Sequence, residues 1–227
     1  MSSIFYLDRP EVANALDLQT TVKLQKEMDQ AIKNKSSGFI ITSKFQKNFC
    51  SGGDLKAFLK MKSKRDGMET HRKIRKILTG FRKKPIVIVC AIEGDAVGGG
   101  CELALACDYV IAGSSARFAF RQVHQNLSPG WGGTKNLLRR VERAQALDWL
   151  TSGRWISAQE ALNRGLVDQI TSSGKALSLS ENFLQNRDSN LIGLFKDLIS
   201  KEGRDEEKVF EKLWWSPPHR RAMGKLT

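Results

Sequence analysis

The segment 98–108 constrains the fold of this chain more than any other. It opens with three consecutive glycines and continues as an apolar stretch with Glu102 near its start. An apolar segment, 85–92, precedes it by a short turn through Gly94. Glycine lets the backbone approach a ligand closely, and the first amides of a helix have no partner inside it. The pattern predicts a strand, a glycine turn and a helix start whose N–H groups can hold an oxyanion beside a proton-transferring carboxylate.

A second segment repeats this arrangement. The apolar run 38–43 leads into 49–56, where Gly52 and Gly53 stand before Asp54. At the start of a helix, Asp54 is interpreted as a structural residue rather than a catalytic one. Two such turns can supply two amide donors, which the oxygen of a thioester enolate requires.

These motifs and their order resemble the crotonase (enoyl-CoA hydratase/isomerase) superfamily. The resemblance is carried by SGGDLK at 51–56, GGGCEL at 98–103 leading to 107–108, and PGWGGT at 129–134. Shorter matches lie at 8–10 with 14–16, where Asp8 replaces the family's usual Asn, and at 157–161 with 165–167. The resemblance covers nearly the whole chain and implies an α/β fold, a spiral of repeated ββα units followed by a helical C-terminal trimerisation region.

The chain therefore divides into a core with an acyl-CoA site at 1–170 and a helical oligomerisation region at 171–227. The resemblance implies a homotrimer or a dimer of trimers. Trp214 and Trp215 would suit subunit contacts, or equally a local core. Independently of the resemblance, alternating patterns argue for βα units. We expect strands at 4–7, 39–42, 85–92, 109–112 and 117–120, and helices at 18–33, 55–60, 70–82, 134–141, 143–151, 158–164, 176–186, 190–201 and 206–215.

The resemblance also assigns roles to single residues. The backbone amides of Gly53 and Gly99 would form the oxyanion hole, and Glu102 matches the first of two glutamates that hydratases of the family use to activate water. The second glutamate's position holds Gln122. Residues expected to bind the substrate, an acyl-CoA thioester, are Gly52, Asp54, Leu55, Lys56 and Trp131.

Gln122 is the most consequential departure, because an amide can bind a water but cannot take its proton. General acid–base catalysis contributes about 10²–10⁴-fold, so ordinary hydration should be severely weakened. Three interpretations remain open. The first is an acyl-CoA enzyme that uses Glu102 and the oxyanion hole alone, for decarboxylation, isomerisation or thioester hydrolysis. The second is an unusual hydratase in which Arg121 or His124 replaces the acid, with His124 on the same face of a strand as Gln122. The third is a non-catalytic acyl-CoA-binding protein.

Five apolar residues are candidate liners of the pocket for the acyl group. They are Leu59, Met61, Leu127, Trp131 and Trp155, and each could equally be ordinary core. An arginine at 121 would suit an acyl group that carries a second carboxylate.

The net charge of +13 requires an explanation. Basic residues gather at 60–65, 71–76 and 82–84, in stretches with helical character and without a nucleic-acid-binding motif. A solvated face that also attracts the phosphates of coenzyme A is favoured over a nucleic-acid partner.

The remaining composition points to an enzyme without a separate cofactor. Three scattered histidines make a metal site improbable, and the four cysteines, none in a CxxC pair, read as reduced buried thiols. Coenzyme A would enter only as part of the substrate. Because neither a long apolar span nor a signal-peptide pattern occurs, we expect a cytoplasmic protein with no membrane partner.

Overall fold

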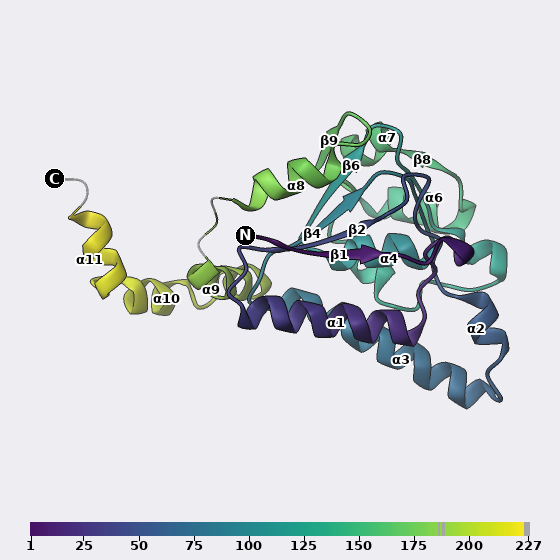
Figure 1. Cartoon of the computed structure of the whole chain (residues 1–227), viewed down its shortest axis with the longest axis horizontal. Coiled ribbons are helices and arrows are strands. Elements are labelled where there is room, and N and C mark those ends of the chain that lie inside the picture. Colours follow the sequence, from purple (N-terminus) through teal and green to yellow (C-terminus); the bar gives the residue numbers. More distant parts are fainter. Residues whose placement is uncertain (186, 188, 225–227) are drawn as a thin grey trace.

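The computed structural model describes residues 1–185, 187 and 189–224, and its strands form two sheets. The first sheet is parallel, with the order β1-β2-β4-β6-β9, and the second has the order β3-β5-β7-β8, in which β8 runs antiparallel to β7 (Figure 1). The strands are β1 (Ser3–Leu7), β2 (Phe39–Ser43), β3 (Asn48–Cys50), β4 (Ile88–Ile92), β5 (Asp95–Val97), β6 (Tyr109–Gly113), β7 (Arg117–Ala119), β8 (Ile156–Ser157) and β9 (Gln169–Thr171).

From β2 to β7, successive strands alternate between the two sheets. β2, β4 and β6 lie side by side in the first sheet, while β3, β5 and β7, which follow them in the chain, lie side by side in the second. Parallel neighbours need a crossover, and helices follow β3 and β5 to make it. The predicted spiral of ββα units is therefore confirmed.

Helices cover both faces of the first sheet and form the C-terminal part. The α-helices are α1 (Leu18–Lys33), α2 (Leu55–Leu59), α3 (Lys64–Gly80), α4 (Gly99–Ala106), α5 (Gly133–Leu137), α6 (Arg143–Ser152), α7 (Ala158–Asn163), α8 (Ala176–Leu184), α9 (Ser189–Ser200), α10 (Glu206–Leu213) and α11 (Pro217–Met223). Short 3-10 helices lie at η1 (Pro10–Val12), η2 (Phe81–Lys83) and η3 (Arg121–Gln125).

The central strands are buried on both faces, as expected for a parallel sheet. On β2, Phe39 and Ile41 join the main core, whereas Ile40 between them joins a second cluster on the opposite face. α8 closes that second face with Ala176 and Leu184. Figure 1 shows α8 on one side of the strands and α1 with α3 on the other.

Most predicted elements are present, and the differences have local causes. The helix predicted at 18–33 has those bounds. The helix predicted at 70–82 begins earlier, at Lys64, because the side chain of Ser63 accepts a hydrogen bond from the Asp66 amide and caps it. β3 and β5 were not predicted, since three-residue strands are too short for a periodicity to register.

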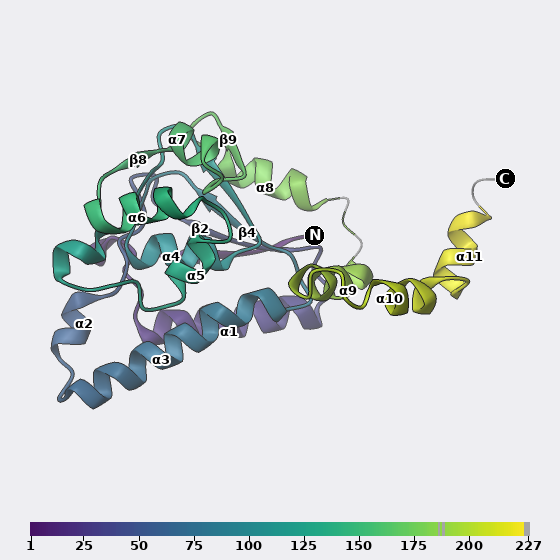
Figure 2. The same ribbon diagram turned by 180° about the vertical axis from the view of Figure 1, so that it is seen from behind.

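The C-terminal arm, defined here as α10 and α11, extends away from the body in both views (Figures 1 and 2). Both of its helices lie within the described residues, and neither buries a side chain. α9 connects the arm to the body. The domain boundary predicted at 170 stays a prediction, although α8 beyond it packs on the first sheet. Among the described residues, no helix combines the length and hydropathy needed to cross a membrane.

Candidate active site

Two glycine turns meet at one place because the strands before them pair. β3 leads into Gly52 and β5 leads into Gly98, and β3 and β5 are parallel neighbours, so both turns leave the same edge of the second sheet. A Cβ on Gly52 would lie 3.0 Å from the Gly99 amide nitrogen. With a φ of +104°, Gly52 also has a backbone conformation that residues with a side chain rarely adopt.

The Gly53 amide is oriented by a single parallel bridge to Leu16. The Leu16 amide donates to the Gly52 carbonyl at 2.7 Å, and the Asp54 amide donates to the Leu16 carbonyl at 2.9 Å. Because amides alternate in direction along an extended strand, the N–H of Gly53 points to the side opposite Leu16. This leaves it available to a ligand.

The 52–54 turn is held by an N-terminal arginine to which sequence reasoning assigned no role. Arg9 Nη2 donates to Asp54 Oδ2 at 2.8 Å, while Asp54 Oδ1 accepts from the Ala57 amide and so caps α2. Although burial opposes it, these bonds hold the pKa of the Asp54 carboxyl below its usual value. The structural interpretation of Asp54 is therefore confirmed; its contact with substrate stays a prediction.

The glycines that open α4 are required by close packing. Gly98 has a φ of +52°, and Gly99 begins the helix, so the Gly99 amide has no intrahelical partner. A Cβ on Gly100 would lie 2.1 Å from the Cys50 carbonyl oxygen. The predicted strand, glycine turn and helix start are all present.

Glu102 lies in the first turn of α4 and is only 3% exposed. Its Oε1 accepts from Gln122 Nε2 at 3.1 Å and the Gly130 amide at 3.2 Å, and its Oε2 accepts from the Trp131 and Gly133 amides at 2.7 and 2.8 Å. Four donors occupy the positions a carboxylate offers. Burial raises the pKa of Glu102, and these hydrogen bonds limit the rise.

Gln122 turns its amide toward Glu102, and its own Oε1 is buried without a hydrogen-bond partner among the described residues. It lies in η3, not in a strand, so the expected shared face with His124 is wrong. Residues two apart in a helix of three residues per turn point in different directions. His124 is exposed instead, and its Nε2 lies 2.8 Å from the position of a Cβ on Gly153.

Trp131 is 3% exposed, and its ring faces the glycine turns. A Cβ on Gly99 would lie 2.3 Å from the ring carbon Cζ3, and one on Gly53 would lie 3.4 Å from Cη2. The indole Nε1 donates to His71 Nδ1 at 3.1 Å. The imidazole of His71, on α3, packs against the ring of Phe58 in a tilted arrangement, with ring centres 4.6 Å apart. Sequence reasoning missed both residues, because only the fold places them here.

The other predicted substrate contacts lie on the surface. Leu55 is 51% exposed, Leu59 85% and Leu127 63%, and Lys56 is exposed as well. Met61 is half-buried. Their contact with an acyl-CoA stays a prediction.

Trp155 and Arg121 lie together. The guanidinium carbons of Arg117 and Arg121 lie 4.4 and 5.0 Å from the centre of the Trp155 ring, which is 37% exposed. The Nε of Arg121 is buried without a hydrogen-bond partner among the described residues. Arg121 thus stacks on an indole next to the Gln122 amide.

The cysteines are free and buried, as predicted. Burial raises the pKa of Cys50 to about 12 and that of Cys101 further, so both are thiols at neutral pH. Among the described residues, no group of three or more His, Cys, Asp or Glu side chains could hold a metal ion.

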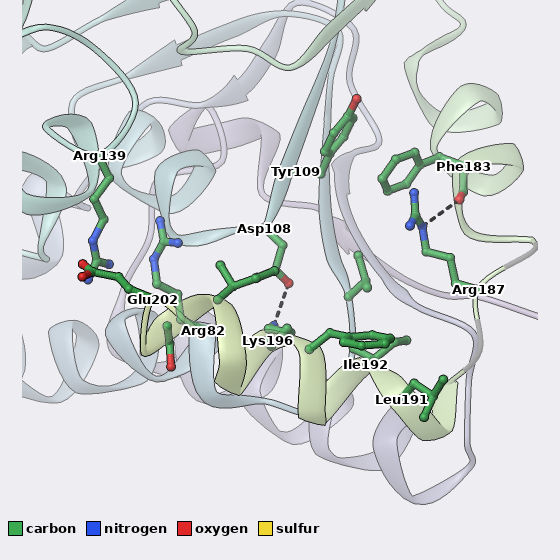
Figure 3. A pocket seen from close by; sticks show the side chains of 14 residues that line it. Arg82, Asp108, Tyr109, Arg139, Phe183, Arg187, Leu191, Ile192, Lys196 and Glu202 are labelled. Atoms are coloured by element: carbon green, nitrogen blue, oxygen red, sulfur yellow. Dashed lines mark hydrogen bonds and ion pairs between the residues drawn. The ribbon is translucent and has the colours of Figure 1, made fainter. Parts of the chain in front are cut away.

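A cavity of about 830 Å³ lies apart from the glycine turns, between α9 and the body (Figure 3). Lys196 of α9 reaches into the body there, where it donates to Asp108 Oδ2 at 2.7 Å and to the carbonyls of Phe81 and Ile86. Burial raises the pKa of Asp108 and lowers that of Lys196, while their ion pair opposes both shifts. This cluster anchors α9 to the body.

A ββα spiral with two glycine turns beside a buried glutamate is the arrangement of a crotonase-type protein. The comparisons agree: the profile of the family "Enoyl-CoA hydratase/isomerase" matches residues 3–204. The chain belongs to the enoyl-CoA hydratase/isomerase family.

Relatives within this family carry different activities in their names. A probable enoyl-CoA hydratase of Rhizobium meliloti is 32% identical over 180 residues, which cover 75% of this chain; the chain spans 65% of that relative's length. The ethylmalonyl-CoA decarboxylase of Mus musculus is 28% identical over 237 residues, covering 98% of this chain and 73% of its own. The crystal structure of the enoyl-CoA hydratase from Bacillus anthracis superposes with a TM-score of 0.92 at 27% identity, covering 99% of this chain and 92% of that one.

Proposed function

We propose that this protein stabilises the enolate of an acyl-CoA thioester and that its reaction is decarboxylation of a 2-carboxyacyl-CoA. The observation that carries the proposal is the hydrogen bond from Gln122 Nε2 to Glu102 Oε1, 3.1 Å long. An amide stands where a water-activating hydratase needs a second carboxylate. Decarboxylation needs no base to begin, because the bond that breaks already supplies the electron pair.

The proposed chemistry uses the two glycine amides first. The thioester oxygen lies between the N–H groups of Gly53 and Gly99. The bond between C2 and its carboxylate breaks, CO₂ leaves, and the electron pair moves through C2 and C1 to the oxygen. Each amide contributes about 3 kcal/mol to the oxyanion, the cost of losing one such donor in other enzymes. A proton then adds to C2 and restores the thioester.

Glu102 is the proposed source of that proton, with Gln122 as its partner. Burial raises the pKa of Glu102, which favours a protonated form. The Gln122 Oε1 has no hydrogen-bond partner among the described residues. If the side-chain amide rotated by 180°, this oxygen could accept a hydrogen bond from Glu102 protonated at Oε1. A glutamine can therefore bond with both protonation states of Glu102, as a second carboxylate could not without repulsion.

The likeness to the ethylmalonyl-CoA decarboxylase of Mus musculus over 98% of the chain supports this proposal. Hydration is the second candidate, supported by the likeness to the probable enoyl-CoA hydratase of Rhizobium meliloti. In that case Arg121 would have to assist the water. It neighbours Gln122, and its Nε is buried without a hydrogen-bond partner among the described residues. Non-catalytic binding of acyl-CoA is the third.

One experiment separates the three. Wild type, Gln122→Glu and Glu102→Gln are incubated with methylmalonyl-CoA, ethylmalonyl-CoA and crotonyl-CoA, and the release of CO₂ and the formation of 3-hydroxyacyl-CoA are measured. We expect CO₂ from the wild type, at least a hundredfold loss in Glu102→Gln, and a gain of crotonyl-CoA hydration in Gln122→Glu. Strong hydration without CO₂ by the wild type would establish the second candidate. Binding of the thioesters without turnover would establish the third.

We further propose that the C-terminal arm joins subunits of a homotrimer, alone or as a dimer of trimers. Phe210, Trp214 and Trp215 are 61%, 53% and 60% exposed. Contiguous exposed aromatic surface of this kind is typical of an interaction site. A cytoplasmic location stays a prediction.

A further inference from the structure

The ring of Trp131 packs beside the α-carbons of Gly53 and Gly99, the two proposed oxyanion donors. Its Cζ3 would lie 2.3 Å from a Cβ on Gly99, and its Cη2 would lie 3.4 Å from a Cβ on Gly53. The ring of Phe58 approaches Gly53 as well, with Cε2 at 2.6 Å from the position of a Cβ there. Only glycines at 53 and 99 leave room for these rings. Both glycines are therefore flanked by aromatic side chains.

Trp131 is held through its backbone and through its ring. The backbone amide donates to Glu102 Oε2 at 2.7 Å, and the ring Nε1 donates to His71 Nδ1 at 3.1 Å. The ring of Phe58 packs against the imidazole in a tilted arrangement, with ring centres 4.6 Å apart. Burial lowers the pKa of His71, so at neutral pH the imidazole is uncharged and its Nδ1 can accept the indole N–H. The ring cannot swing aside without losing that bond.

The position of the ring has a consequence for the acyl group. An oxygen bonded to both amides lies about 3 Å from each nitrogen. An acyl group that leaves the thioester carbonyl on the side of Trp131 would then meet the indole, which already contacts Gly99. Two or three further carbons can follow the ring edge, whereas a long chain must displace a buried tryptophan that is 3% exposed.

We propose that Trp131 is the specificity-determining residue that restricts the site to short acyl groups, and that His71 is the positioning residue that holds it. This inference rests on the proposed function, because it assumes an acyl-CoA bound at the Gly53 and Gly99 amides. It adds the size of the acyl group, and it assigns roles to Trp131 and to His71 on α3.

The test is a chain-length series in binding, which does not depend on the reaction. Isothermal titration calorimetry measures the Kd of butyryl-CoA and decanoyl-CoA for the wild type, Trp131→Ala and Trp214→Ala. We expect the wild type to bind decanoyl-CoA at least about tenfold more weakly than butyryl-CoA, and Trp131→Ala to lose or reverse that difference. Trp214→Ala, a matched tryptophan deletion at a 53% exposed ring of the C-terminal arm, should keep the wild-type ratio.

His71 is tested by rescue. His71→Phe keeps the ring and removes the acceptor, so discrimination should fall about threefold or more. His71→Gln offers an amide oxygen to the same indole N–H and should restore most of it. A purely structural role would give equal losses in both variants.

The outcomes separate this inference from the proposed reaction. Equal Kd values for the two thioesters in the wild type, or an unchanged ratio in Trp131→Ala, would overturn the size restriction while CO₂ release could stand. A clear restriction without CO₂ release would overturn the reaction alone. Failure of the wild type to bind either thioester would overturn both.

Discussion

The glycine-turn site and the C-terminal arm of this protein are built in opposite ways. At the site, a carboxylate that is 3% exposed has four hydrogen-bond donors, and an indole that is also 3% exposed packs on backbone. The arm lies within the described residues and buries no side chain, and Trp214 stacks only on arm neighbours such as Phe210 and His219. Between them, Lys196 ties α9 to Asp108.

This difference indicates which part of the protein is fully packed within a single chain and which part is not. The glycine turns and Glu102 need no second copy to be ordered, because the body supplies every donor and every packing neighbour named above. The arm leaves aromatic area in water, and burial of such area is worth about 25 cal/mol per Å². Changes at the site should therefore alter folding of one chain, while changes in the arm should alter assembly.

The largest effect is expected from Gly100→Ala. The new methyl would lie 2.1 Å from the Cys50 carbonyl oxygen, so α4 and β3 must move apart. The free energy of unfolding should fall by about 3 kcal/mol or more, measured by urea denaturation. Gly80→Ala is the matched control: it also lies in a helix, a Cβ there meets no atom within 4 Å, and it should be neutral or slightly stabilising. Equal stability of the two variants would show that the closely packed site tolerates a methyl group as well as the open position at Gly80 does.

An intermediate effect is expected from Asp54→Asn, with a defined dependence on pH. The Asp54 carboxylate caps α2 and pairs with Arg9, so the variant should lose about 1–2 kcal/mol of stability at pH 7. Its folded-state pKa is lowered, so this stabilisation is fully present above the ordinary carboxyl pKa and is lost as pH falls through the lowered value. Denaturation at pH 7 and at a series of pH values below the ordinary carboxyl pKa should show the gap between wild type and variant narrowing as the pH falls. A gap of constant size across that series would assign the loss to packing instead.

The smallest effect on folding, and the largest on assembly, is expected from Trp214→Ser combined with Trp215→Ser. Both side chains are more than half exposed, so urea denaturation should show a change of less than about 0.5 kcal/mol per chain. Sedimentation velocity should show the assembly shifting toward single chains. Loss of several kcal/mol of stability with unchanged sedimentation would mean that the arm packs on its own body, and the comparison would fail.

Much of the fold was readable from the sequence because it is locally encoded. Asp17 caps the helix 18–33, whose bounds were predicted, and continuous apolar runs mark the buried strands β2 and β4. The strands β3 and β5 escaped prediction because they gain their stability from pairing with each other. The prediction for His124 failed because the chain after β7 turns into a 3-10 helix that brings Gln122 to Glu102.

By itself, the sequence determined the two glycine turns, the place of Glu102 at a helix start, and the amide in place of a carboxylate at Gln122. These follow from backbone sterics and side-chain chemistry at single positions. Only the tertiary structure decided that the two glycine turns lie side by side, that Glu102 accepts four hydrogen bonds, and that Trp131 is held by His71, sixty positions away. Those relations join residues far apart in the chain, so no local pattern records them.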